Sequence, residues 1–192
     1  MPEQNLSWEI LDYRGKSSGE TIPQWLNSFL EGGISAVERL EEFQNYYTFI
    51  SMNSGTNINA LKQWSTGFSP DLDFARLIAV RIENRFLRAA RTYPDEAYGS
   101  YFIALIRSAS DALWEGAVRD SDFWLFRTFY ETDDEDRSSW EHYDFFILVK
   151  VEKNLLVPQI RTLLENVQPQ DPLSPDQNAA VSQVQRQFFE SF

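Results

Sequence analysis

The longest regular pattern of apolar and polar positions lies in residues 71–91, DLDFARLIAVRIENRFLRAAR. At about 100° per residue, one broad arc of a helix carries the apolar side chains and the opposite arc carries the arginines. The apolar set is Ala75, Ile78, Ala79, Ile82, Phe86, Ala89 and Ala90. Ser69 or Asp71 is a suitable N-cap, Pro70 suits the first turn, and Pro94 ends the helix. The segment predicts a long helix whose apolar side is covered by the rest of the domain.

Three further segments are aromatic and β-branched, as is typical of strands. They are residues 46–52 (YYTFISM), 121–131 (SDFWLFRTFYE) and 141–153 (EHYDFFILVKVEK). The second and third predict an antiparallel hairpin joined by residues 132–139. Their order with the long helix is β-α-β-β, which differs from alternating βα units.

Shorter helical patterns flank this core. They cover residues 23–30, 35–43, 57–64, 95–115 and 154–167, with a break between the first two at Gly32-Gly33. The chain is therefore predicted to be α+β, with a small three-stranded antiparallel sheet packed on the long helix and additional flanking helices.

The composition divides the chain into three parts. Residues 1–20 are polar and predict an N-terminal arm, and residues 21–167 predict a single α+β domain. Residues 168–192 begin as a Pro/Gln-rich linker and end in a short amphipathic tail. The apolar residues of that tail include Val181, Val184, Phe188 and Phe189.

Charge and composition exclude several classes of function. The net charge of −12 argues against nucleic acid as the main partner, because phosphate binding needs a basic surface. The absence of cysteine excludes disulfides, thiolate nucleophiles and cysteine metal sites. No segment has the apolar length of a transmembrane helix, and the first residues lack the pattern of a signal peptide. The expected location is the cytoplasm or, for a mature form whose signal was removed, the periplasm or cell envelope.

Several short motifs suggest a family. Pro23-x-Trp25 comes first, then Tyr47-x-Phe49 in a strand that ends near Gly55, then the helix motifs Asp73-x-Ala75-Arg76 and Ala79-x-Arg81. Over residues 22–152 this order resembles the twenty-kilodalton membrane-associated lipoprotein family and the related N-terminal domain of flagellar assembly protein T. The resemblance implies a β-α-β-β core, export with frequent lipid anchoring, and envelope roles without catalysis. A membrane link is expected only through such an anchor, whose cysteine is expected to have been removed together with the signal, because the chain as given has none.

The motifs of common enzymes are absent. His142 is the single histidine, and on a strand it shares a face with Asp144, so a local hydrogen bond is expected. No G-x-S-x-G sequence accompanies it. Asp111 and Glu115, one helical turn apart beside Trp114, are a carboxylate pair that suits either sugar chemistry or an ordinary solvated helix face. We expect no enzyme activity, no catalytic residues and no cofactor.

An acidic run, Asp133-Asp134-Glu135-Asp136, lies in the predicted hairpin connection. Clustered carboxylates suit calcium, but the run lacks the glycine and the final glutamate of an EF-hand loop. A solvated hairpin tip that discourages edge pairing is the favoured interpretation, so no metal site is predicted.

Two groups of residues are candidate binding sites. Trp114 and Trp124 with Asp111 and Glu115 suit a carbohydrate or another small molecule. Arg81, Arg85 and Arg88 suit an anion, although a solvated arginine face at a helix C-terminus gives the same pattern.

The sequence therefore favours a non-catalytic exported or envelope-associated protein that acts through protein-protein contacts, including self-association as a homo-oligomer. The aromatic tail and the exposed strand edges support this expectation. The alternative is a small-molecule or carbohydrate-binding protein that uses the tryptophans and acids, and a hydrolase is the third choice.

Overall fold

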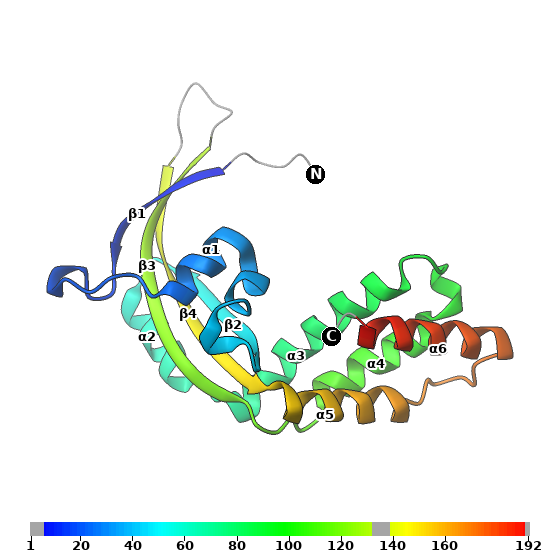
Figure 1. The fold of residues 1–192 in the computed structure, drawn as a ribbon. Helices are drawn as coiled ribbons and strands as arrows, with labels where there is room; N and C mark the ends of the chain where they lie inside the picture. The colour runs from blue at the N-terminus through cyan, green and yellow to red at the C-terminus, as the bar shows by residue number, and fades with distance from the viewer. Residues whose placement is uncertain (1–5, 132–138, 191–192) are drawn as a thin grey trace. The chain divides into compact units, whose positions relative to one another are not determined.

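The structure, a computed structural model, describes residues 6–131 and 139–190. The chain forms two compact units, each built from two separate stretches of sequence (Figure 1). The sheet unit lies within residues 1–68 and 118–150, and the helical unit lies within residues 69–117 and 151–192. Residues 21–167, predicted as one domain, contribute to both units. The predicted α+β class is confirmed.

The sheet unit carries one antiparallel sheet in the strand order β1-β3-β4-β2 (Figure 1). The strands are β1 (Leu6–Tyr13), β2 (Tyr46–Gly55), β3 (Val118–Glu131) and β4 (Ser139–Glu152). The predicted antiparallel pairing of β3 with β4 is confirmed, with a register from Val118 opposite Lys150 to Tyr130 opposite Ser139. The predicted strand count is wrong, because the sheet has four strands and not three.

The additional strand is β1, in residues predicted to be an N-terminal arm. It pairs with β3, placing Trp8 opposite Phe129 and Ile10 opposite Arg127, and its register shifts between Ile10 and Asp12. Trp8 and Leu11 remain exposed on β1. An edge strand needs to bury only part of one face, so its apolar alternation is weak. For that reason β1 was not predicted from the sequence.

Helices cover both faces of the sheet. On one face, α1 (Gln24–Val37) contributes Trp25, Leu26 and Val37 to a core that also contains Phe123, Leu125, Phe146 and Leu148. On the other, α2 (Ile58–Gly67) places Trp64 against Phe145, with ring centroids 6.3 Å apart. Successive strand residues point to opposite faces, so Phe145 and Phe146 belong to different layers.

Local sequence sets the ends of these helices. The predicted break at Gly32-Gly33 is confirmed as a kink in α1, where Gly33 has φ +66°, a conformation that favours glycine. The Asn57 side chain accepts hydrogen bonds from the backbone N–H groups of Asn59 and Ala60 at 2.9 and 3.3 Å, which starts α2. Two 3-10 helices, η1 (Lys16–Ser18) and η2 (Glu41–Phe43), complete this unit.

The helical unit contains the predicted long helix. This helix, α3 (Pro70–Ala90), is confirmed, and within its unit it packs against α4 (Gly99–Asp111) and α6 (Pro175–Glu190). The unit also holds η3 (Asp95–Ala97) and α5 (Lys153–Asn166), which packs against α4. Pro70 occupies the first turn of α3 as predicted, but the Ser69 hydroxyl does not cap it. Instead, the Asp73 carboxylate accepts the Ser69 N–H at 2.8 Å.

The predicted linker and tail belong to this unit. Residues 175–190 form the helix α6, in which Val181, Val184 and Phe188 are buried as the apolar spacing predicted. This helix packs on α3, so it is a structural element of the helical unit.

One hydroxyl group joins three helices of the helical unit. The Tyr101 Oη of α4 donates to the Leu164 carbonyl of α5 at 2.7 Å and accepts from Gln185 Nε2 of α6 at 2.7 Å. Gln185 Nε2 also donates to the Leu164 carbonyl at 3.1 Å. Burial raises the pKa of Tyr101 to about 12.

The raised pKa of Tyr101 makes the stability of the helical unit depend on pH. The unfolded chain releases this proton near pH 10 and the folded chain near pH 12, so the contribution is fully present below pH 10 and is lost as pH rises to 12. We expect a loss of roughly 2–3 kcal/mol across this window. Urea unfolding followed by circular dichroism, with Tyr101→Phe as the control, measures it. An equal loss in both proteins would contradict the assignment to Tyr101.

Candidate functional site

The predicted site around Trp114 begins where α4 ends. Helix α4 ends at Asp111, and Ala112 is extended, with φ −71° and ψ 146°. Trp114 is 8% exposed, and its Nε1 donates to the Ala109 carbonyl at 2.9 Å, which satisfies an acceptor in the last turn of the helix. Glu115 therefore lies beyond the helix. The prediction that Asp111 and Glu115 share one helical face is wrong.

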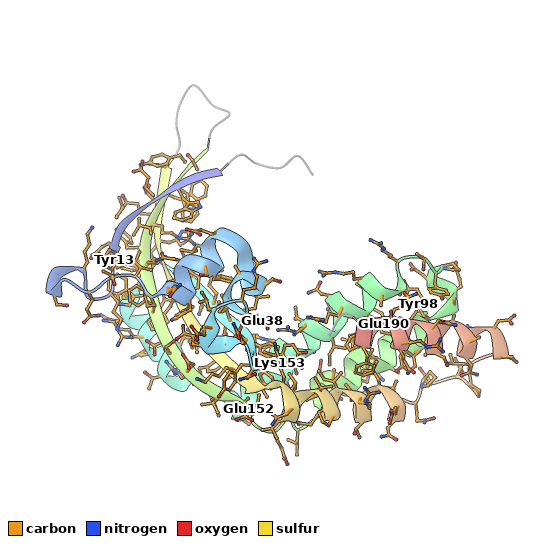
Figure 2. The ribbon with its side chains drawn as sticks, viewed as in Figure 1. Tyr13, Glu38, Tyr98, Glu152, Lys153 and Glu190 are labelled. Atoms are coloured by element: carbon orange, nitrogen blue, oxygen red, sulfur yellow. The ribbon has the colours of Figure 1, made fainter. Side chains whose placement is uncertain are left out.

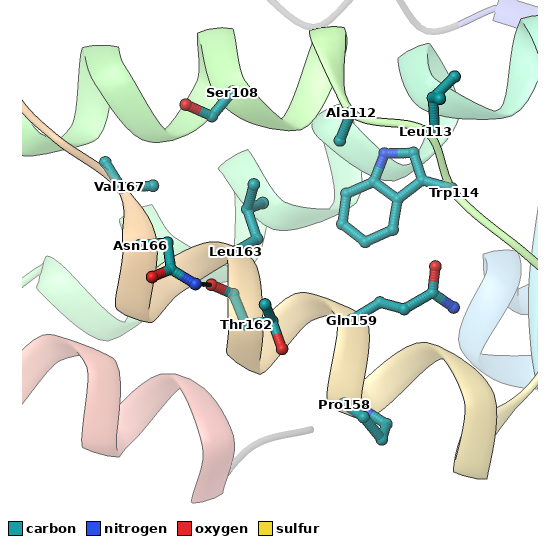
Figure 3. Close-up of a pocket in the computed structure, with 10 residues that line it drawn as sticks. All are labelled: Ser108, Ala112, Leu113, Trp114, Pro158, Gln159, Thr162, Leu163, Asn166 and Val167. Carbon is teal, nitrogen blue, oxygen red and sulfur yellow. Dashed lines mark hydrogen bonds between the residues drawn. The ribbon is translucent and has the colours of Figure 1, made fainter.

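Beside Trp114, α4 and α5 enclose an open groove of about 470 Å³ (Figure 3). Its lining is Ser108, Ala112, Leu113, Trp114, Pro158, Gln159, Thr162, Leu163, Asn166 and Val167. Neither Asp111 nor Glu115 lines it, and both carboxylates are exposed elsewhere on the unit. The lining contains no charged residue, so the groove suits an apolar and uncharged group.

Gln159 of α5 connects the two sides of the groove through hydrogen bonds to the backbone that follows α4. The Oε1 atom of Gln159 accepts from the Glu115 N–H at 2.8 Å. Its Nε2 donates to the Glu115 carbonyl at 3.1 Å and to the Leu155 carbonyl at 2.9 Å. Because both ends of this amide are engaged, Gln159 holds the residues after α4 against α5 and fixes the groove.

Trp124 and Trp114 belong to different units. It lies on β3 in the sheet unit, where it packs edge-on against Tyr143 with ring centroids 5.6 Å apart. Trp114 belongs to the helical unit. The structure therefore assigns the two predicted tryptophans to separate units.

The three residues of the predicted arginine stripe differ in exposure. Arg81 and Arg85 of α3 are half-buried and already interact with other groups of the chain, whereas Arg88 is exposed. The three guanidinium groups therefore do not present one exposed surface to an anion.

A cluster that the sequence did not single out as a site lies on the α1 face of the sheet. Arg127 of β3 donates to Asp144 of β4 from Nε and from Nη2, each at 2.6 Å from Oδ2. The other carboxylate oxygen, Oδ1, lies 3.2 Å from His142 Nε2 and accepts the Ser54 hydroxyl of β2. The Asp144 side chain is 1% exposed, so these donors replace all the water around a buried charge.

Aromatic rings enclose this ion pair. The Arg127 guanidinium lies 4.9 Å from the ring centroids of both Trp8 and Phe129. Phe129 in turn stacks on His142 at 4.6 Å and on Trp140 at 5.7 Å, with interplanar angles of 11° and 12°. The rings exclude water and strengthen the charge pair through a low local dielectric. The predicted contact of His142 with Asp144 is confirmed.

The order of groups in this cluster does not suit hydrolysis. In a serine triad, histidine lies between the nucleophile and the acid, because it must take the hydroxyl proton. Here the acid Asp144 lies between Ser54 and His142, so the Ser54 hydroxyl donates to a carboxylate. The arrangement is that of a satisfied structural ion pair.

A polar hollow on the sheet unit also contains an ion pair. Arg14, Glu20, Asp122 and Phe123 are among its lining residues. Asp122 accepts from Arg14 Nη1 at 2.6 Å and from Arg119 Nη2 at 2.5 Å, so its charge is compensated within the chain. Among the lining residues, the Arg14 and Asp122 charges are therefore already engaged with each other and are not offered to a ligand.

The remaining predictions concern metal and membrane. The acidic run Asp133–Asp136 lies outside the described residues. In the part of the chain that the structure describes, no three His, Asp or Glu residues are grouped to hold a metal ion. Residues 6–131 and 139–190 contain no helix with both the length and the apolarity of a membrane span.

Comparison of the chain with protein-family models, curated proteins and solved structures found no match.

Proposed function

We propose that this protein is a non-catalytic, exported or cell-envelope-associated protein that acts through contacts with other proteins, including further copies of itself. The observation that carries the proposal is the apolar surface at the groove between α4 and α5. Leu113 is 93% exposed at this groove, beside a lining without charge. Leu113 is almost fully in water next to an apolar groove. Burial of this surface by a partner lowers the free energy, so the surface favours binding.

The chemistry of the clusters supports a role without catalysis. His142 is engaged by Asp144 and by the Phe129 ring, and Ser54 donates to the same carboxylate. None of these groups is arranged as a nucleophile with its base. The groove itself holds no acid or base among its lining residues.

The proposed location has a different support. Export and envelope association follow from the resemblance of residues 22–152 to the lipoprotein family. The net charge of −12 disfavours a direct role on anionic lipid surfaces. Contact with envelope proteins is therefore the form of association that we propose.

Photo-crosslinking in the native organism tests the proposal. A photoreactive amino acid at Leu113 is expected to give crosslinked products with protein, recovered in the envelope or periplasmic fraction. The same group at Gln183, an exposed polar position of α6, is the matched control and is expected to give much less product.

Two outcomes would contradict the proposal. Equal or absent products at Leu113 and Gln183 would argue against a protein-binding groove, and products confined to the cytosol would argue against the location. In the first case the alternative, a small-molecule or carbohydrate-binding protein, gains support, because the Trp114 ring lines a groove of suitable size.

A further inference from the structure

The outward face of α3 carries an ordered stripe of side chains. Leu72, Val80 and Leu87 are 82%, 51% and 40% exposed. Arg76, which is exposed, and Glu83, which is half-buried, lie on the same face between these apolar residues. At about 100° per residue all five positions fall within an arc of about 80°. We call these five residues the α3 stripe.

The two charges of the α3 stripe do not neutralise each other. Arg76 and Glu83 are seven residues apart, which places them about 10 Å apart along the helix axis. Neither is in an ion pair in the described part of the chain. Both are therefore available to groups outside the molecule.

Four of the five positions in the stripe are symmetric about one point. Arg76 and Glu83 are equally distant from the midpoint between residues 79 and 80, and so are Leu72 and Leu87. A two-fold axis through this point would bring each charge opposite the other sign and each leucine opposite a leucine. This is the self-complementary pattern that a two-fold interface requires.

We propose that α3 pairs antiparallel with α3 of a second copy of this chain, across a two-fold axis near Val80. Arg76 then meets Glu83 of the second copy twice, and Leu72 meets Leu87 of the second copy twice. A parallel pairing would place Arg76 opposite Arg76, so charge selects the antiparallel arrangement. This inference rests on the proposed function, since it names one of the protein partners and the surface that meets it.

Charge reversal tests the pairing. Sedimentation velocity from about 1 μM to about 1 mM is expected to show a monomer-dimer equilibrium for the unchanged protein. Arg76→Glu alone and Glu83→Arg alone are each expected to weaken the homodimer about tenfold or more, because like charges then meet. An equimolar mixture of these two variants is expected to recover association, because every charge again faces the opposite sign.

The control is Arg107→Glu, which makes the same charge change at an exposed position of α4 in the same unit. It is expected to associate as the unchanged protein does, and circular dichroism checks that all variants remain folded.

A strictly monomeric protein, charge variants that associate normally, or a mixture that fails to recover would each overturn the α3 pairing. The crosslinking at Leu113 concerns a different surface, so failure of the pairing is distinguishable from failure of the proposed function.

Discussion

Replacement of Asp144 by alanine is expected to destabilise the sheet unit by roughly 3–5 kcal/mol. The carboxylate is buried and receives both Arg127 donors, the Ser54 hydroxyl and the contact of His142. Its removal leaves the Arg127 guanidinium between Trp8 and Phe129 without a counter-charge. The cost is mainly that of an uncompensated buried cation, and much less that of the lost hydrogen bonds.

The two units allow this loss to be measured separately. Five of the six tryptophans, Trp8, Trp25, Trp64, Trp124 and Trp140, belong to the sheet unit, and Trp114 belongs to the helical unit. Urea unfolding followed by tryptophan fluorescence therefore reports mostly on the sheet unit. Because the chain has two units, the transition of each is fitted separately.

A double variant separates the charge effect from the packing effect. Arg127→Met with Asp144→Leu removes both charges and keeps apolar volume, so it is expected to be clearly more stable than Asp144→Ala alone. A double variant as unstable as Asp144→Ala would show that shape, and not the unpaired guanidinium, sets the cost.

The elements that could be predicted from the sequence are those with a long regular period. The helix at residues 71–91 and the strands at 121–131 and 141–153 each bury a face over many residues, so their apolar spacing repeats several times. The structure confirms them with ends shifted by only a few residues.

The elements that were missed depend on contacts far along the chain. β1 is an edge strand whose partner β3 lies more than a hundred residues later, and its own pattern is weak. α6 looked like a tail because only a few apolar residues recur in it, and its burial depends on α3. The end of α4 at Asp111 is set by the turn that buries Trp114, which helix periodicity does not reveal.

The same distinction applies to the candidate sites. The contact of His142 with Asp144 follows from strand alternation alone, because residues two apart share a face. Adding Arg127 requires the register of β3 against β4, and adding Ser54 requires the position of β2 in the sheet. The observed groove at Trp114 lacks the predicted Asp111 and Glu115 for a local reason, because the helix that was expected to carry both residues ends at Asp111.

The two faces of helix α3 have different roles. The inner face, with Ile78, Ile82 and Phe86 fully buried, holds the helical unit together. On the outer face, the apolar side chains of the α3 stripe, Leu72, Val80 and Leu87, are exposed. Substitutions on the two faces should therefore affect different measurements.

Phe86→Ala is expected to destabilise the helical unit by roughly 3–5 kcal/mol. The Phe86 ring is fully buried and lies 5.7 Å from the Tyr98 ring, 5.8 Å from the Tyr101 ring and 5.4 Å from the Phe102 ring. Tyr98 lies at the start of α4 (Figure 2), so the lost ring contacts are those that join α3 to α4. The alanine leaves a cavity that three aromatic rings cannot fill by small movements.

Leu72→Ser is the matched change on the outer face of the same helix. Because the Leu72 side chain is already in water, its replacement is expected to change the free energy of unfolding by no more than about 0.5 kcal/mol. Urea unfolding followed by circular dichroism measures both variants, and sedimentation velocity measures their association. If the α3 pairing is correct, Leu72→Ser weakens the dimer while the fold is kept, and Phe86→Ala weakens the fold first. Equal effects of the two variants on unfolding would contradict the division of α3 into an inner structural face and an outer binding face.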